Sequence, residues 1–268
     1  MLNPPGGMEM RVATESEKTS PIKVKPLRTA GQSLDEKMND LIEDRSLLLA
    51  MMVAVALIMA GNEWIRSFTN APPYPKLFTC IALGVIAYSW VSMRRLRREV
   101  RNLRLGWEGE RVVGDLLDGL RTKGYFVFHD VPAPGFNLDH MIISPQGVFV
   151  VETKTHSKYP DSRVYFGGTK VLLDGREPGR NPLDQARATA RWLQEALVQS
   201  TGRKFPVRAV IVYPGWYVDS AKGANAGDIW VLNPKGVGPF IEQEPVVLRP
   251  EDLHLAADRV AILSRQAA

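Results

Sequence analysis

The sequence predicts an α/β domain, with a mixed sheet flanked by helices, preceded by a transmembrane helical hairpin. Three observations lead to this prediction. Residues 137–154 hold two β-branched runs around a proline-containing turn, which is typical of a β-hairpin. Helical and strand patterns alternate on both sides of that hairpin, as they do in α/β domains. Upstream, the runs 46–62 and 77–93 are each seventeen residues long and free of charge.

The N-terminal segment, residues 1–45, is predicted to be a disordered polar tail, because it holds four prolines and few large apolar residues before Leu34. Within it a short helix over residues 33–43 is indicated, since Ser33 could cap it and Glu36 would complete a capping box. No secretory signal is expected, because the first apolar run lies far from the N-terminus.

The two apolar runs within residues 46–93 are predicted to span a membrane, joined by a short loop over residues 63–76. Each would be about 25 Å long as a helix, near the lower limit for a hydrocarbon core of about 30 Å. Trp64 and Trp90, near their ends, suit the membrane interface. The alternative is a pair of buried helices in a soluble domain, which the lack of a polar face in the first run disfavours. Neither run contains an ionisable residue, which disfavours a transporter.

Arginines predict the orientation of these spans. The juxtamembrane segment 94–104 carries six arginines, whereas the loop 63–76 carries only one Arg and one Lys. By the positive-inside rule the C-terminal domain faces the cytoplasm, and two spans return the N-terminus to the same side. We therefore expect a multi-pass protein of the cell inner (cytoplasmic) membrane. The arginines could equally form a nucleic-acid patch, but binding of anionic lipid headgroups beside the spans is the preferred interpretation.

The hairpin places two carboxylates opposite each other. If residues 144–147 form its loop, Asp139 faces Glu152 on the neighbouring strand, and Lys154 lies on the same face of the sheet. Like charges in that position repel, and a divalent cation would remove the cost. The alternative is a simple ion pair between Lys154 and Glu152 on a solvated strand end. Apolar residues on both faces of the two strands argue against it, because such strands are buried.

These residues resemble a known pattern. An Asp, a spacer of about a dozen residues and then Glu-x-Lys are similar to the core of the PD-(D/E)xK nucleases. The wider stretch resembles the nuclease-related domain (NERD) family in four motifs, which span residues 106–110, 137–140, 147–154 and 181–185. The resemblance implies a restriction-endonuclease-like fold over residues 105–215, with residues 216–268 as a C-terminal extension that packs on the domain.

Helical and strand patterns place the remaining motifs. Residues 107–123 have apolar residues at helical spacing and end at Gly124. Glu110 lies at the edge of the packed face of that helix. The resemblance makes it a further metal or water ligand, and complementing the helix dipole is the alternative. Asn181 would cap a helix that runs to about residue 198. Strands are predicted over 125–131, 207–213 and 229–232, a pair of short strands over 165–173, and a closing helix over 250–265.

Two hypotheses of function follow from the resemblance. In the first, the protein is a membrane-anchored nuclease that hydrolyses phosphodiester bonds in nucleic acid, with DNA favoured. Asp139, Glu152 and the Thr153 carbonyl would bind Mg²⁺ or Mn²⁺, and Lys154 would orient the attacking water or stabilise the developing charge. In the second, the domain is a catalytically inactive membrane-tethered module that binds nucleic acid or serves as a scaffold.

Several other residues are interpreted more simply. Gln185 and Arg187, early in the helix from residue 182, are candidate substrate contacts, with a solvated helix surface as the alternative. His140 is predicted to be structural because it points away from Asp139, and His156 is unassigned. The single cysteine excludes a disulfide framework and a Cys-based zinc site. A net charge of +5 is compatible with anionic partners, and nothing in the sequence selects an oligomeric state.

Overall fold

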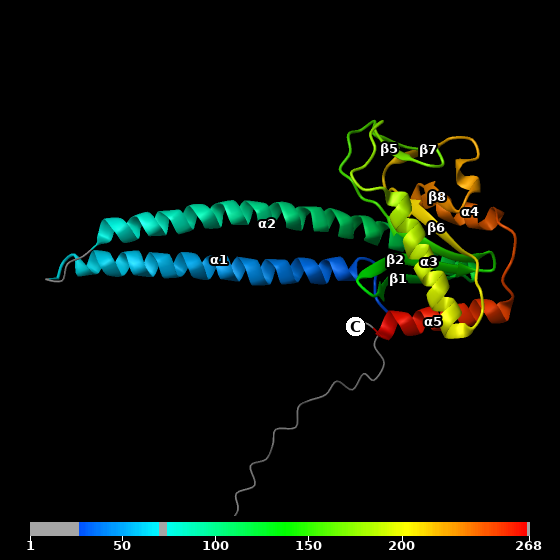
Figure 1. Cartoon of the computed structure of the whole chain (residues 1–268), viewed down its shortest axis with the longest axis horizontal. Helices are drawn as coiled ribbons and strands as arrows, with labels where there is room; N and C mark the ends of the chain where they lie inside the picture. The colour runs from blue at the N-terminus through cyan, green and yellow to red at the C-terminus, as the bar shows by residue number, and fades with distance from the viewer. Residues whose placement is uncertain (1–26, 70–73, 267–268) are drawn as a thin grey trace, which may run out of the picture.

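The computed structural model describes residues 27–69 and 74–266, so residues 1–26 of the tail predicted over 1–45 lie outside the described residues. Two long antiparallel helices project from one side of an α/β domain (Figure 1). They are α1 (Gln32–Arg66) and α2 (Pro75–Asp118), and they lie side by side. Alanines form part of the seam between them, because small side chains let two helices approach closely: Ala56, Ala60 and Ala82.

The outer surface of this helical hairpin is apolar. Both helices are long and apolar enough to cross a membrane. Many of the large side chains in their apolar stretches are exposed, among them Leu48, Val55, Ile58, Leu83 and Trp90. A continuous exposed apolar surface requires an apolar environment or partner. Length and composition therefore favour membrane association of the hairpin.

The start of α1 differs from the prediction. Residues 27–45 were expected in the disordered tail, with a short helix over 33–43, but they form a short loop and the first turns of one continuous helix. Ser33 does not cap this helix. Its backbone N–H and its hydroxyl donate to Asp130 of the domain at 2.9 and 2.6 Å. Local sequence rules could not predict this contact, because the two residues are 97 positions apart.

Helix α2 joins three segments that were predicted separately. The second apolar run, the arginine segment 94–104 and the first helix of the domain form one helix of 44 residues. No proline interrupts them after Pro75, and arginine is a good helix former. The short 3₁₀ helix η1 (Gly119–Lys123) follows, and Gly124 ends it with a φ of 80°, at the predicted position. The apolar stretch and the domain therefore share one helix.

A five-stranded sheet forms the centre of the domain, in the order β1-β2-β3-β6-β8. Its neighbours are antiparallel from β1 to β3 and parallel from β3 to β8, so the predicted mixed sheet is confirmed. The strands are β1 (Phe126–Ala133), β2 (Phe136–Ser144), β3 (Gly147–Thr153), β6 (Val207–Val212) and β8 (Ile229–Leu232).

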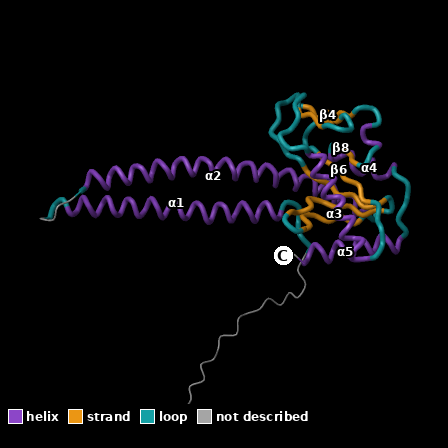
Figure 2. The backbone as a smooth tube through the Cα atoms, in the orientation of Figure 1, coloured by secondary structure: helices purple, strands orange, loops and turns teal. Residues whose placement is uncertain are grey.

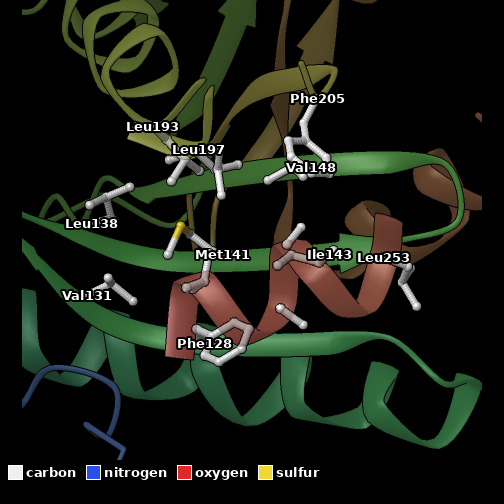
Figure 3. Packing of buried hydrophobic residues seen from close by; sticks show 14 of the residues in the cluster. Phe128, Val131, Leu138, Met141, Ile143, Val148, Leu193, Leu197, Phe205 and Leu253 are labelled. Atoms are coloured by element: carbon white, nitrogen blue, oxygen red, sulfur yellow. The ribbon is translucent and has the colours of Figure 1, made fainter. Parts of the chain in front are cut away.

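Helices cover both faces of this sheet (Figure 2). α2 and α4 (Val237–Gln243) pack on one face, and α3 (Pro182–Thr201) and α5 (Pro250–Gln266) on the other. Side chains of the hairpin alternate between the two cores: Met141 and Val150 face α3 and α5, whereas Ile142 and Phe149 face α2. Figure 3 shows the first core, where residues of β1, β2 and β3 meet the two helices. The predicted burial of the hairpin on both faces is confirmed.

A second sheet has three short strands, β4 (Arg163–Phe166), β5 (Val171–Leu173) and β7 (Tyr217–Ser220). The pair β4 and β5 lies where it was predicted, but β7 was missed because two of its four residues, Asp219 and Ser220, are polar and give it no apolar run. Residues 216–268 were expected as an extension. They instead supply β7, β8 and α5 to the sheets and cores of the domain, together with the 3₁₀ helices η2 (Ala224–Ala226) and η3 (Pro234–Gly236).

Candidate active site

The register of the β2–β3 hairpin brings the two predicted carboxylates together. Its pairs run from Ser144 opposite Gly147 to His140 opposite Val151. One further step along both strands places Asp139 across from Glu152, as the sequence predicted. The turn is shorter than the predicted loop, because the pairing of Ser144 with Gly147 leaves only residues 145–146 unpaired.

Glu152 belongs to a tight network of three side chains. The side chain of Glu152 is only 7% exposed. Lys154 Nζ donates to Glu152 Oε1 at 2.8 Å. Gln185, from the first turn of α3, donates to the same oxygen at 2.6 Å and accepts from Lys154 Nζ at 2.9 Å. Asn181 caps α3 as predicted, by accepting from the Leu183 N–H, and this fixes the turn that carries Gln185. Gln185 therefore holds both the acid and the lysine in place.

Asp139 is partly buried beside this network. The backbone N–H of Thr153 donates to its Oδ2 at 2.7 Å. Burial raises the pKa of Asp139 well above its usual value, and the negative charges of Glu152 and Glu110 raise it further; the Thr153 hydrogen bond and Lys154 act in the opposite direction. The charged form of the carboxyl group is therefore destabilised, and a bound cation would stabilise it.

Glu110 approaches the same site from α2. Burial raises its pKa to about 7, with further contributions from the negative charges of Asp130 and Glu152, while Lys154 lowers it. Glu108, two residues earlier, is exposed and pairs with Arg104 at 3.1 Å. Of the two acidic residues in the Gly-Trp-Glu-Gly-Glu stretch, Glu110 is therefore the one that joins the cluster.

The neighbouring Gly109 permits the close approach of α2 to the chain that leaves β3. A Cβ atom at this position would lie 2.0 Å from Thr155 Oγ1 and 3.0 Å from its Cβ. Gly109→Ala should therefore destabilise the fold by about 1–3 kcal/mol and move Glu110 away from Asp139. Thermal unfolding of the detergent-solubilised chain measures this loss. Gly119→Ala is the control, because no atom lies within 4 Å of a Cβ there. Equal unfolding temperatures for the two variants would contradict the argument.

A chain of hydrogen bonds runs through two buried histidines from the exposed Asp118 to Thr153, which follows Glu152 on β3. His129 Nε2 lies 3.1 Å from Asp118, the two histidine Nδ1 atoms of His129 and His140 lie 2.9 Å apart, and His140 Nε2 lies 3.1 Å from Thr153 Oγ1. Burial lowers the pKa of His140 well below its usual value, which keeps the ring neutral. Each of the three contacts can then hold one hydrogen. His129 donates to Asp118, His140 donates to His129, and Thr153 donates to His140. His140 is structural, as predicted.

Residues 105–214 match the model of the nuclease-related domain family. This segment contains the site residues Glu110, Asp139, Glu152, Lys154 and Gln185. No curated protein and no solved structure matches the chain. The match ends after β6, whereas β8 and α5, outside it, complete the sheet and one core of the domain that contains the matched segment.

Arg187 was predicted as a substrate contact, but the structure does not bring it to the cluster. Its guanidinium pairs with Asp228 through two contacts of 2.8 and 3.2 Å. Two residues along a helix turn the side chain by about 200°, so Arg187 points away from the direction of Gln185. His156, which was left unassigned, stacks on Tyr213.

Sequence reasoning missed Asp130. It lies on β1, opposite Asp139 of β2. The flanking pairs are His129 with His140 and Val131 with Leu138. Asp130 is 1% exposed, has a φ of 47° and accepts hydrogen bonds from Arg28, Ser33 and Asn137. Its charge raises the pKa of Glu110. An aspartate in the middle of an apolar strand was the signal in the sequence that could have found it.

The donor atoms at the site fit a hard divalent cation only in part. Within residues 27–69 and 74–266, no three His, Cys, Asp or Glu side chains are grouped so as to hold a metal by themselves. Mg²⁺, however, commonly takes one or two carboxylates and completes its shell with water and phosphate oxygens. Asp139 and Glu152 supply such a pair. Burial, and then repulsion from Glu152 and Glu110, raises the pKa of Asp139, and a bound cation would oppose both effects.

Proposed function

We propose that the protein is a membrane-anchored, metal-dependent nuclease that hydrolyses phosphodiester bonds in nucleic acid, with DNA favoured. One observation carries the proposal. Asp139, Glu152 and Lys154 lie at one end of the hairpin, and Glu110 approaches them from α2. All four lie inside the segment that matches the nuclease-related domain. Two acids that repel each other destabilise the folded domain, and binding of nucleic acid alone does not require them. Their presence beside a fixed lysine therefore favours a catalytic role.

Asp139 and Glu152 would hold Mg²⁺ or Mn²⁺, with the Thr153 carbonyl as a third ligand. When bound, such an ion polarises the scissile phosphate and lowers the pKa of a bound water. The protein contributes the positions of its own groups. The Thr153 N–H fixes one oxygen of Asp139, and Gln185 fixes one oxygen of Glu152.

Lys154 would stabilise the negative charge that develops on the phosphate, because Glu152 and Gln185 hold its ammonium group in one position. Glu110, when ionised, would accept a proton from the attacking water, since a pKa of about 7 suits proton transfer near neutral pH. Gln185 is a positioning residue in this scheme.

Membrane anchoring by α1 and α2 is part of the proposal. The exposed apolar side chains of both helices and the arginines that follow the second run support it. The positive-inside rule then places the nuclease-related domain in the cytoplasm and both termini on that side of the cell inner membrane.

The test uses the full chain in detergent micelles with plasmid, linear duplex, single-stranded DNA and RNA, in the presence of Mg²⁺ or Mn²⁺. Cleavage that EDTA and Glu152→Gln abolish is the expected result. Arg187→Gln is the matched control, because Arg187 pairs with Asp228 outside the cluster. Binding of nucleic acid without cleavage of any of these substrates would contradict the enzymatic proposal and support the inactive tethered module.

A further inference from the structure

A hollow of about 550 Å³ lies between α2 and the segments that carry β4 and β7, and none of the cluster residues described above lines it. One wall is the flank of α2, through Val112 and Leu116, whose side chains are largely exposed. The opposite wall comes from the loop before β4 and from the start of β7, which carries Tyr217.

The hollow combines cations with an open aromatic ring. Lys158, Arg163 and Lys235 line it, against a single carboxylate, Asp161. Tyr217 is 63% exposed, and the Arg163 guanidinium lies over its ring at 5.2 Å from the centroid. Proteins that bind single-stranded nucleic acid combine aromatic rings, on which bases stack, with cations that contact phosphates. At Tyr217 a base would stack on the face of the ring opposite Arg163.

The position of the hollow suits a strand that leads to the carboxylates. Lys158 follows Lys154 by four residues, which can separate them by at most about 14 Å of extended chain. The indole N–H of Trp216 donates to the His156 carbonyl at 3.3 Å, which ties the wall of the hollow to the segment that leaves β3. About four nucleotides of a stacked strand cover this distance, at about 3.4 Å each.

We propose that this hollow binds single-stranded nucleic acid, with a base stacked on Tyr217 and phosphates contacted by Lys158, Arg163 and Lys235. The inference rests on the proposed nuclease function and names its substrate class as a single strand. A duplex is a poorer fit, because its bases are stacked on each other and cannot present a face to Tyr217.

The experiment measures binding of a fluorescent oligothymidylate of about 20 nucleotides to the full chain in micelles, with EDTA present to prevent cleavage. Tyr217→Ala should weaken binding about 5- to 100-fold, and Tyr217→Phe should retain it, because the ring alone stacks. Lys235→Ala should reduce the slope of log affinity against log salt concentration by about 0.7, the value for one phosphate contact on a single strand.

Matched controls lie on the same small sheet and in the turn that follows its strand β7. Tyr165 is 43% exposed on β4 but does not line the hollow, and Lys222 is a cation outside it. Tyr165→Ala and Lys222→Ala should therefore leave affinity within about twofold, as surface changes away from a contact do. Equal loss with Tyr165→Ala and Tyr217→Ala, no loss with Tyr217→Ala, or no binding by the unmodified chain would overturn the inference.

The failure of this inference is distinguishable from failure of the proposed function. Glu152→Gln should abolish cleavage and leave oligothymidylate binding intact. If the chain cleaves nucleic acid but Tyr217→Ala binds a single strand normally, the nuclease proposal stands and the hollow has no such role. Equal competition by duplex DNA at the same phosphate concentration would also overturn the single-strand assignment.

Discussion

Asp139→Asn is expected to lower the rate of phosphodiester cleavage by at least about 100-fold, because a neutral amide cannot hold the cation that polarises the phosphate. The same change should stabilise the metal-free protein near pH 8. The carboxyl of Asp139 has a pKa raised by burial and by neighbouring acids, so its charged form costs folding free energy there. An amide oxygen can still accept from the Thr153 N–H. We expect an unfolding temperature at least about 2 °C higher, the shift that roughly 1 kcal/mol produces.

Asp258→Asn is the control for this experiment, because Asp258 is an exposed acid on α5, outside both the cluster and the hollow. It should change neither the cleavage rate nor the unfolding temperature. Addition of Mn²⁺ should raise the unfolding temperature of the unmodified chain but not that of Asp139→Asn. A variant that loses activity and stability together would show that the carboxylate is structural, contrary to the proposal.

Glu110→Gln should remove part of the pH dependence of stability. The pKa of Glu110 rises from its ordinary value of 4.5 to about 7 in the folded protein, where the folded state binds the proton more tightly than the unfolded state. The stabilising contribution of the protonated form is therefore full below pH 4.5 and is lost as the pH rises to about 7. The loss is on the order of 3 kcal/mol. Unfolding temperatures of the metal-free chain between these pH values measure it.

Glu108→Gln on the same helix is the matched control, because its exposed side chain pairs with Arg104 and lies outside the cluster. This variant should keep the full pH slope. Asp139 contributes a slope of the same sign, so Glu110→Gln should flatten the profile without removing it. An unchanged slope in Glu110→Gln would show that Glu110 is solvated and does not share the site.

Local sequence rules were sufficient for the elements that obey one strong periodicity. The β2–β3 hairpin alternates over two β-branched runs, and its register follows once its turn is located. For this reason the opposition of Asp139 and Glu152 could be predicted. The cap at Asn181 and the stop at Gly124 are likewise local chemistry, and both lie at the predicted residues.

Other features depend on residues that are distant in the chain. Ser33 resembled a helix cap, but its hydroxyl donates to Asp130, which only the folded domain presents. Arg187 resembled a substrate contact, but Asp228, 41 positions away, pairs with it. β7 has half polar residues and no apolar run that would predict a strand, and it forms because β4 offers an edge for pairing.

The sequence by itself determined the apolar hairpin, the alternation that makes an α/β sheet, and the residue types that gather at the site. Only the tertiary structure decided that α2 is one helix from the apolar run to Glu110, and that Gln185 fixes both Glu152 and Lys154. The physical reason is the separation along the chain over which each effect acts. Periodicity and capping act over a few residues, whereas burial, ion pairing and the pKa of a carboxyl group depend on which distant segments pack around it.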